Sequence, residues 1–232
     1  MIAKRIAEAI QYPKQVLEVG PGKGIMTREL LPVAESLKAS EIDKEAIQFL
    51  TDLDILKKGQ IIEGDFLQID ISSVFDGEFS IIGNFPYYIS SQIVFKVIDN
   101  HSLIPEMVGM FQKEVAERIF APPGSKTYGG ISVLVASRYQ SELLFILNEE
   151  DFNPPPKVKS AVIRLERKAD ALDDDAYRKL SVIVKAAFNQ RRKTLRNSLR
   201  SVSISEIPSD LISKRPEQCS LEDFLRLSAL LQ

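Results

Sequence analysis

The segment Asn84-Phe85-Pro86-Tyr87 contains the residues best suited to chemistry on a nucleobase. The exocyclic nitrogen of adenine is a poor nucleophile because its lone pair is delocalised into the ring. The side-chain oxygen of Asn84 and the carbonyl of Pro86 can each accept one hydrogen of that amino group, and proline fixes φ, so this carbonyl has a pre-set direction. Tyr87 offers a face on which an extracted base can stack, a contact worth about 1–3 kcal/mol. The segment therefore favours methyl transfer to an amino group, driven by positioning.

Three further loops carry residues that suit an adenosine-containing cofactor. The glycine loop Gly20-Pro21-Gly22-Lys23-Gly24 follows a predicted strand, and its backbone can approach a ligand closely. Glu41 ends the next strand, where an acid can accept hydrogen bonds from ribose hydroxyls. Asp65 can accept from an adenine amino group, with Phe66 packed near the ring. These loops leave NAD and S-adenosylmethionine open, and the Asn84 segment favours S-adenosylmethionine.

The composition argues against several other chemistries. The chain has 232 residues, a formal net charge of -2, one histidine and one cysteine. His101 lies in a sequence typical of a solvated helix end, and the chain has no metal-ligand spacing, so we expect no metal. No apolar run approaches the about 18 residues of a membrane span, and the start lacks a signal-peptide pattern. We therefore expect a cytoplasmic protein with no membrane partner.

The elements that must position these residues alternate between strand and helix up to about Arg167, which predicts a Rossmann-like α/β sheet. Asp43 is predicted to cap the helix after the second strand. A closing hairpin is expected through Asn153-Pro154-Pro155-Pro156. The predicted strands are 16–19, 39–42, 60–63, 79–83, 107–111, 143–147 and 160–166.

From Asp173 onward the pattern is helical alone, with apolar faces in 177–188 and 221–231. The acidic stretch 170–175 marks the predicted boundary between a domain of residues 1–169 and a small helical domain of residues 170–232.

The helical region also carries a run of basic residues with no acid between them. A charge run is usually a solvated helix face, but phosphate contacts from such a cluster would give salt-sensitive RNA binding. The loop 121–128, with Lys126 and Tyr128, is expected to add a mobile basic and aromatic element. The run consists of Lys185, Arg191, Arg192, Lys193, Arg196 and Arg200.

Longer segments resemble the KsgA-type family of small-subunit rRNA adenine N6,N6-dimethyltransferases over nearly the whole chain. The matching segments are 18–22, 40–43, 83–90, 112–115, 124–129, 152–158 and 187–194. The last three of these segments are specific to that family rather than to methyltransferases in general.

The resemblance implies a seven-stranded class I methyltransferase sheet with an antiparallel final strand, and S-adenosylmethionine as methyl donor. It implies dimethylation of two adjacent adenines in the 3′-terminal hairpin of 16S rRNA, on the immature 30S subunit, and we expect a monomer. Phe188 resembles the aromatic that closes over the target base, and Arg191, Arg192, Lys193, Arg196 and Lys126 are expected to face RNA. The expected cofactor residues are Gly20, Gly22, Glu41, Ile42, Asp65, Phe66 and Asn84.

One departure from the family bears on activity. Its members usually carry a Gln-x-Phe-Leu-type segment over the methionine end of the cofactor, whereas this sequence begins at Met1 inside the helix that follows. Binding without turnover, as in an RNA-binding assembly factor, is therefore one alternative. A large-subunit rRNA methyltransferase of the resistance type is a second, and a DNA adenine methyltransferase is a third.

Overall fold

The computed structural model describes residues 2–152 and 155–232, which pack into two compact units. The sheet unit comprises the described residues of 1–116 and 142–167, and the helical unit comprises 117–141 and 168–232. The chain thus crosses between the units near the expected boundary at 169/170, but the segment 117–141 packs with the helical unit. A division into two independent domains stays a prediction.

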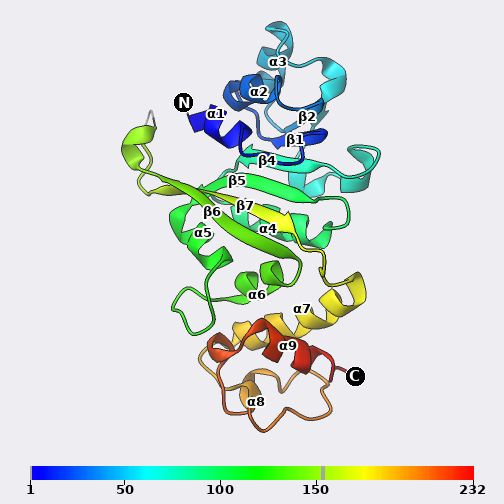
Figure 1. The fold of residues 1–232 in the computed structure, drawn as a ribbon, viewed down its shortest axis with the longest axis vertical. Helices are drawn as coiled ribbons and strands as arrows, with labels where there is room; N and C mark the ends of the chain where they lie inside the picture. The colour runs from blue at the N-terminus through cyan, green and yellow to red at the C-terminus, as the bar shows by residue number, and fades with distance from the viewer. Residues whose placement is uncertain (1, 153–154) are drawn as a thin grey trace. The chain divides into compact units, whose positions relative to one another are not determined.

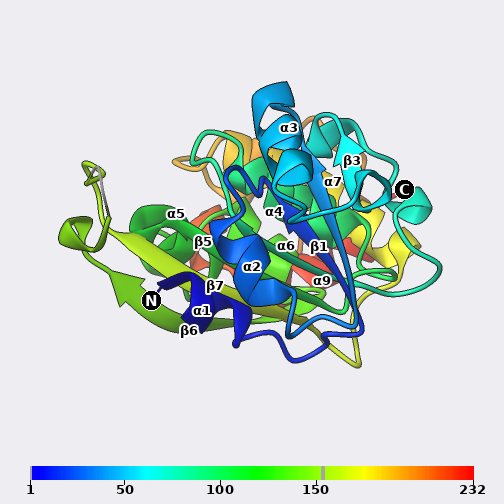
Figure 2. The ribbon, with the colours of Figure 1, turned by 90° about the horizontal axis from the view of Figure 1, so that it is seen from above.

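The described residues form a sheet of seven strands, the number that the sequence and the resemblance predict. The order of the strands is β3-β2-β1-β4-β5-β7-β6 (Figures 1 and 2). Strands β1 to β5 pair in parallel, whereas β7 runs antiparallel to β5. β1 lies between β2 and β4, so the order of strands reverses there, and ligands bind α/β sheets at such a switch point. The strands are β1 (Gln15–Val19), β2 (Ser36–Glu41), β3 (Ile61–Glu63), β4 (Ser80–Asn84), β5 (Glu106–Gln112), β6 (Tyr139–Leu147) and β7 (Ser160–Arg167).

Helices cover the sheet, and one of them, α3, has the polar cap that the sequence predicts (Figure 1). The Asp43 carboxylate accepts from the Glu45 N–H at 2.9 Å, which confirms the predicted cap of α3. Helices α1 and α2 lie side by side (Figures 1 and 2). The elements are α1 (Ile2–Ala7), α2 (Ile25–Leu30), α3 (Lys44–Asp52), η1 (Lys58–Gln60), η2 (Phe66–Gln68), η3 (Ile71–Ser73), α4 (Ser90–Asp99), α5 (Lys113–Ile119) and η4 (Glu149–Asp151).

The core of the sheet unit is formed by the inward faces of the first helices and the central strands. Buried apolar side chains pack into one cluster, and this burial is the main stabilising term of the unit. Of the predicted proline connection between β6 and β7, Asn153 and Pro154 lie outside the described residues. The cluster includes Ile6, Val16, Leu30, Leu50, Ile82, Val108 and Val162.

The helical unit is built around α7, whose predicted apolar face is confirmed. Tyr177, Leu180 and Ile183 on this face are buried. The second predicted face is shorter than expected, because α9 ends at Ser228. The remaining elements are α6 (Gly130–Ala136), α7 (Asp174–Asn189), α8 (Leu195–Ser198), η5 (Pro216–Gln218) and α9 (Leu221–Ser228).

None of the helices in 2–152 and 155–232 is long and apolar enough to cross a membrane. The same residues contain no group of three or more His, Cys, Asp or Glu side chains that could hold a metal ion.

Candidate active site

The glycine loop after β1 is closed by the acid at the end of β2. Gly20, Gly22 and Gly24 have φ values of 72°, 53° and 71°, which glycine adopts without strain. Oε2 of Glu41 accepts from the Gly22 N–H at 3.0 Å, and its Oε1 accepts from the N–H groups of Ile42 and Asp43 at 2.8 and 3.0 Å. A carboxylate has about four acceptor sites, so this geometry leaves about one for a ligand hydroxyl.

The predicted cofactor residues Ile42, Asp65 and Phe66 differ in how much surface or hydrogen-bonding capacity they leave for a ligand. Ile42 is 67% exposed, a large apolar surface at the carboxyl edge of the sheet. Asp65 caps η2, where its Oδ1 accepts from the Leu67 N–H at 2.9 Å. Phe66 is only 4% exposed, and the Lys96 ammonium lies 5.3 Å from its ring centre. The ring of Phe66 therefore leaves little surface for the predicted packing against a ligand base.

The buried ring of Phe85 fixes the position of the Asn84 segment. Asn84 ends β4 opposite Met110 of β5, and it is exposed. The ring of Phe85 is buried directly over Gly83 and Gly109, where a Cβ on either glycine would collide with it. Two glycines on adjacent strands thus make room for Phe85 and fix the backbone that presents Asn84.

The next residues of the segment are tied by hydrogen bonds. The Pro86 carbonyl accepts from the Ile89 N–H at 3.1 Å, which leaves its second lone pair for another donor. The Tyr87 hydroxyl lies 2.7 Å from the Ser160 hydroxyl, so the half-buried ring is anchored at one end. Tyr88 is 84% exposed and adds an aromatic surface that sequence reasoning did not single out.

A cavity of about 830 Å³ opens beside the glycine loop and Asn84. Sequence-predicted residues from two loops, Gly20, Gly22 and Asn84, line it together, whereas Glu41 and Asp65 do not. The other lining residues belong to α1, β1, the glycine loop, α2, β5, the end of η4 and the residue after it. They include Ile2, Ala3, Arg5, Ile6, Glu18, Lys23, Ile25, Met26, Met110, Asp151 and Phe152.

Glu18 is the site residue that sequence reasoning missed. It lies on β1, is fully buried, lines the cavity, and neither carboxylate oxygen has a hydrogen-bond partner among the described residues. Burial, and then the negative charge of Glu41, raise the pKa of Glu18 to about 7, against a lowering by the Thr27 hydroxyl. The sequence signal that could have identified Glu18 is an acidic residue among the apolar residues of the predicted first strand.

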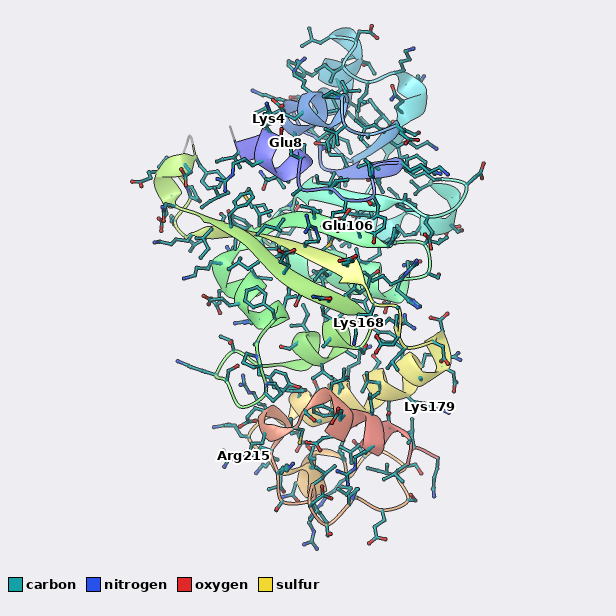
Figure 3. All side chains as sticks on the ribbon, in the orientation of Figure 1. Lys4, Glu8, Glu106, Lys168, Lys179 and Arg215 are labelled. Atoms are coloured by element: carbon teal, nitrogen blue, oxygen red, sulfur yellow. The ribbon has the colours of Figure 1, made fainter. Side chains whose placement is uncertain are left out.

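Glu106, a second buried acid of the sheet, has the hydrogen-bond partners that Glu18 lacks within the described ranges. Glu106, labelled in Figure 3, is also fully buried, at the start of β5. Its carboxylate accepts from the N–H groups of Gln11 and Tyr12 and lies 3.0 Å from the Arg164 guanidinium. A buried carboxylate without such partners is costly, so Glu18 is suited to a cationic ligand group.

Replacing Glu18 by glutamine should stabilise the unliganded protein above pH 7 by up to about 3 kcal/mol. Between pH 4.5 and about 7, the folded state holds a proton that the unfolded chain has lost, so wild-type stability falls as pH rises through this window. Glutamine does not titrate, so urea unfolding at pH 8.5 should show the gain and unfolding at pH 4.5 should not. An equal difference at both pH values would contradict the assignment.

In the helical unit, Phe188 is half-buried between two aromatic rings. Its ring centre lies 6.0 Å from that of Tyr128 and 5.7 Å from that of Phe224. Tyr128 is buried and its hydroxyl donates to the Cys219 carbonyl at 2.9 Å. Tyr128 therefore does not supply the aromatic part of the mobile loop element that the sequence predicts, because its ring has a packed site with a partner for its hydroxyl.

The predicted RNA-facing residues fall into two groups. Arg191 is half-buried: its guanidinium donates to the Lys126 carbonyl at 2.8 Å and lies 3.9 Å from the Glu217 carboxylate. Arg192, Lys193 and Arg196 are exposed. A hollow of about 460 Å³ within this unit is lined by Gln190, Lys193, Asn197, Arg200 and Ser201.

The sequence is similar to those of named bacterial enzymes. It is 46% identical to a ribosomal RNA small subunit methyltransferase A of Parabacteroides distasonis, with 100% of this chain and 89% of the relative covered. It is 47% identical to the protein of that name from Flavobacterium johnsoniae, with 98% of this chain and 89% of the relative covered.

The fold is similar to those of solved structures. A dimethyladenosine transferase from Plasmodium falciparum matches with a TM-score of 0.80 and 27% identity, covering 97% of this chain and 93% of that one. The 23S rRNA methyltransferase ErmE matches with a TM-score of 0.74 and 26% identity, covering 99% and 96%. The family model described as ribosomal RNA adenine dimethylase matches residues 1–232. With these matches and the switch-point site, the chain belongs to the ribosomal RNA adenine dimethylase family.

Proposed function

We propose that this protein transfers methyl groups from S-adenosylmethionine to N6 of two adjacent adenines in the 3′-terminal hairpin of 16S rRNA. The observation that carries the proposal is the cavity that joins the glycine loop, the unpartnered Glu18 carboxylate and Asn84. Relatives that share 46–47% of its residues are named small-subunit rRNA methyltransferases, which supports the small subunit over the large-subunit alternative.

The residues of the site fit the cofactor by charge and shape. The remaining acceptor site of Glu41 suits a ribose hydroxyl, and Asp65 suits an adenine amino group. The exposed Ile42 side chain offers an apolar face to the base. Gly20 and Gly22 follow β1 and Phe66 follows β3, at the same carboxyl edge of the sheet. When bound, S-adenosylmethionine supplies an electrophilic methyl group on a sulfonium.

The chain itself contributes position rather than acid–base chemistry. Asn84 Oδ1 and the free lone pair of the Pro86 carbonyl accept the two amino hydrogens of adenine, which directs the nitrogen lone pair out of the ring plane. Tyr87, anchored at Ser160, holds the base by stacking. Phe188, in the helical unit, keeps the stacking role that the family resemblance implies. The product ammonium loses its proton readily, so no strong general base is required.

The partner we infer is the immature 30S subunit, which a monomer in the cytoplasm would meet during ribosome assembly. Exposed Arg192, Lys193 and Arg196, with Lys126, give the cationic surface for its phosphates.

The test is transfer of labelled methyl groups from S-adenosylmethionine to unmethylated small subunits, large-subunit rRNA and DNA, followed by mapping of the modified bases. We expect label on two adjacent adenines of 16S rRNA only. Label on large-subunit rRNA or DNA alone would refute the proposed substrate, and binding to small subunits without label would support an assembly factor instead.

A further inference from the structure

The cavity beside Asn84 extends to helix α1 and offers a place for the amino-acid end of the cofactor. The proposed function assigns the adenosine end to Glu41 and Asp65, and the methyl group to the vicinity of Asn84. Neither of those acids lines the cavity, whereas Asn84 does. From Asn84 the cavity continues along β1 and β5 to helix α1. The methionine moiety, with its ammonium and carboxylate groups, therefore belongs at the α1 side.

This end of the cavity presents both charges that a zwitterion needs. The buried, unpartnered Glu18 carboxylate is complementary to the ammonium group. A carboxylate requires a cation, and the cationic side chains that line the cavity are Arg5 on α1 and Lys23 in the glycine loop. Both are exposed, so exposure does not distinguish them.

The environment of Arg5 distinguishes it from Lys23. The guanidinium carbon of Arg5 lies 3.9 Å from the centre of the Phe145 ring, within stacking distance. A guanidinium held by its face keeps the N–H donors at its edge free, and those donors match a carboxylate in a fork. In the described part of the chain no carboxylate lies within ion-pair distance of Arg5, whereas its neighbour Lys4, labelled in Figure 3, pairs with Glu8 at 3.8 Å.

We propose that Arg5 binds the α-carboxylate of the methionine moiety of S-adenosylmethionine, with Phe145 as the platform that orients its guanidinium. The inference rests on the proposed function, since it takes the cofactor from there. It makes α1 a wall of the cofactor site in addition to a part of the core.

Two ligands that differ only in the carboxylate test this role. Calorimetry would give the Kd of the wild type, Arg5→Ala, Arg5→Lys and Lys23→Ala for S-adenosylmethionine and for decarboxylated S-adenosylmethionine. For the first ligand, Arg5→Ala should weaken binding about 10- to 100-fold, the range for a hydrogen-bonded charge pair. For the second ligand it should change binding less than about twofold. Arg5→Lys should recover part of the loss, because it keeps the charge without the fork.

The other variants separate the possible outcomes. The preference for S-adenosylmethionine over its decarboxylated form should stay near the wild-type value in Lys23→Ala. In Phe145→Ala this preference should fall. An equal loss for both ligands in Arg5→Ala, no loss for either, or a selective loss in Lys23→Ala would overturn the role of Arg5. Unchanged thermal unfolding of each variant checks that it is folded. Failure of the wild type to bind either ligand would instead refute the proposed cofactor.

Discussion

Alanine at position 84 should lower methyl transfer by at least about 10²–10³-fold, the cost of removing one pre-positioned hydrogen-bonding group from an active site. Asn84 is exposed at the end of β4, so its side chain contributes little to the core, and thermal unfolding should be unchanged. The loss should appear in single-turnover transfer to unmethylated small subunits, because the missing acceptor no longer directs the adenine nitrogen at the methyl group.

A matched variant separates this effect from a general loss of an amide. Gln92 is exposed on α4, which begins shortly after the same loop, and it does not line the cavity. Gln92→Ala should retain full activity. The expected loss leaves Asn84→Ala with about one hundredth of the wild-type rate or less. If the variant kept more than about a tenth of the wild-type rate, the acceptor role of Asn84 would be wrong.

Reversal of Arg192 and Arg196 to glutamate should abolish methylation of small subunits while the affinity for S-adenosylmethionine stays unchanged. Both side chains are exposed, so their replacement leaves the packing of the helical unit intact. Each lost phosphate contact removes counterion release, so RNA binding should weaken and its dependence on salt should become shallower, by a slope of about 0.7–0.9 per contact. Filter binding at several salt concentrations measures both changes.

Arg191, although it is part of the same run, is a poor choice for this experiment. Its guanidinium is bonded to the Lys126 carbonyl and lies near Glu217, so a glutamate there would disturb the fold as well as the surface. The control is Lys57→Glu with Lys58→Glu, two exposed residues of the sheet unit, which changes the formal charge by the same amount. If this control lost as much RNA binding as the Arg192 and Arg196 reversal, net charge and not the basic surface would explain the effect.

The sequence by itself determined the sheet and the carboxyl-edge loops. Strand positions followed from runs of β-branched and apolar residues, and the cap at Asp43 from local side-chain chemistry, because both depend on neighbours in the sequence. The segment 84–87 and the acids at 41 and 65 were identifiable for the same reason: each directly follows a strand. The resemblance of longer segments then supplied the family.

Only the tertiary structure decided which of these groups have partners. Burial of Phe66 and Tyr128 depends on residues distant in sequence, so neither could be read from a local pattern. The same holds for Arg191, whose contacts at Lys126 and Glu217 make it structural as well as cationic. The most informative case is Glu18: its type and strand are visible in the sequence, but its isolation beside a cavity is not, because hydrogen-bond satisfaction is a property of the packed fold.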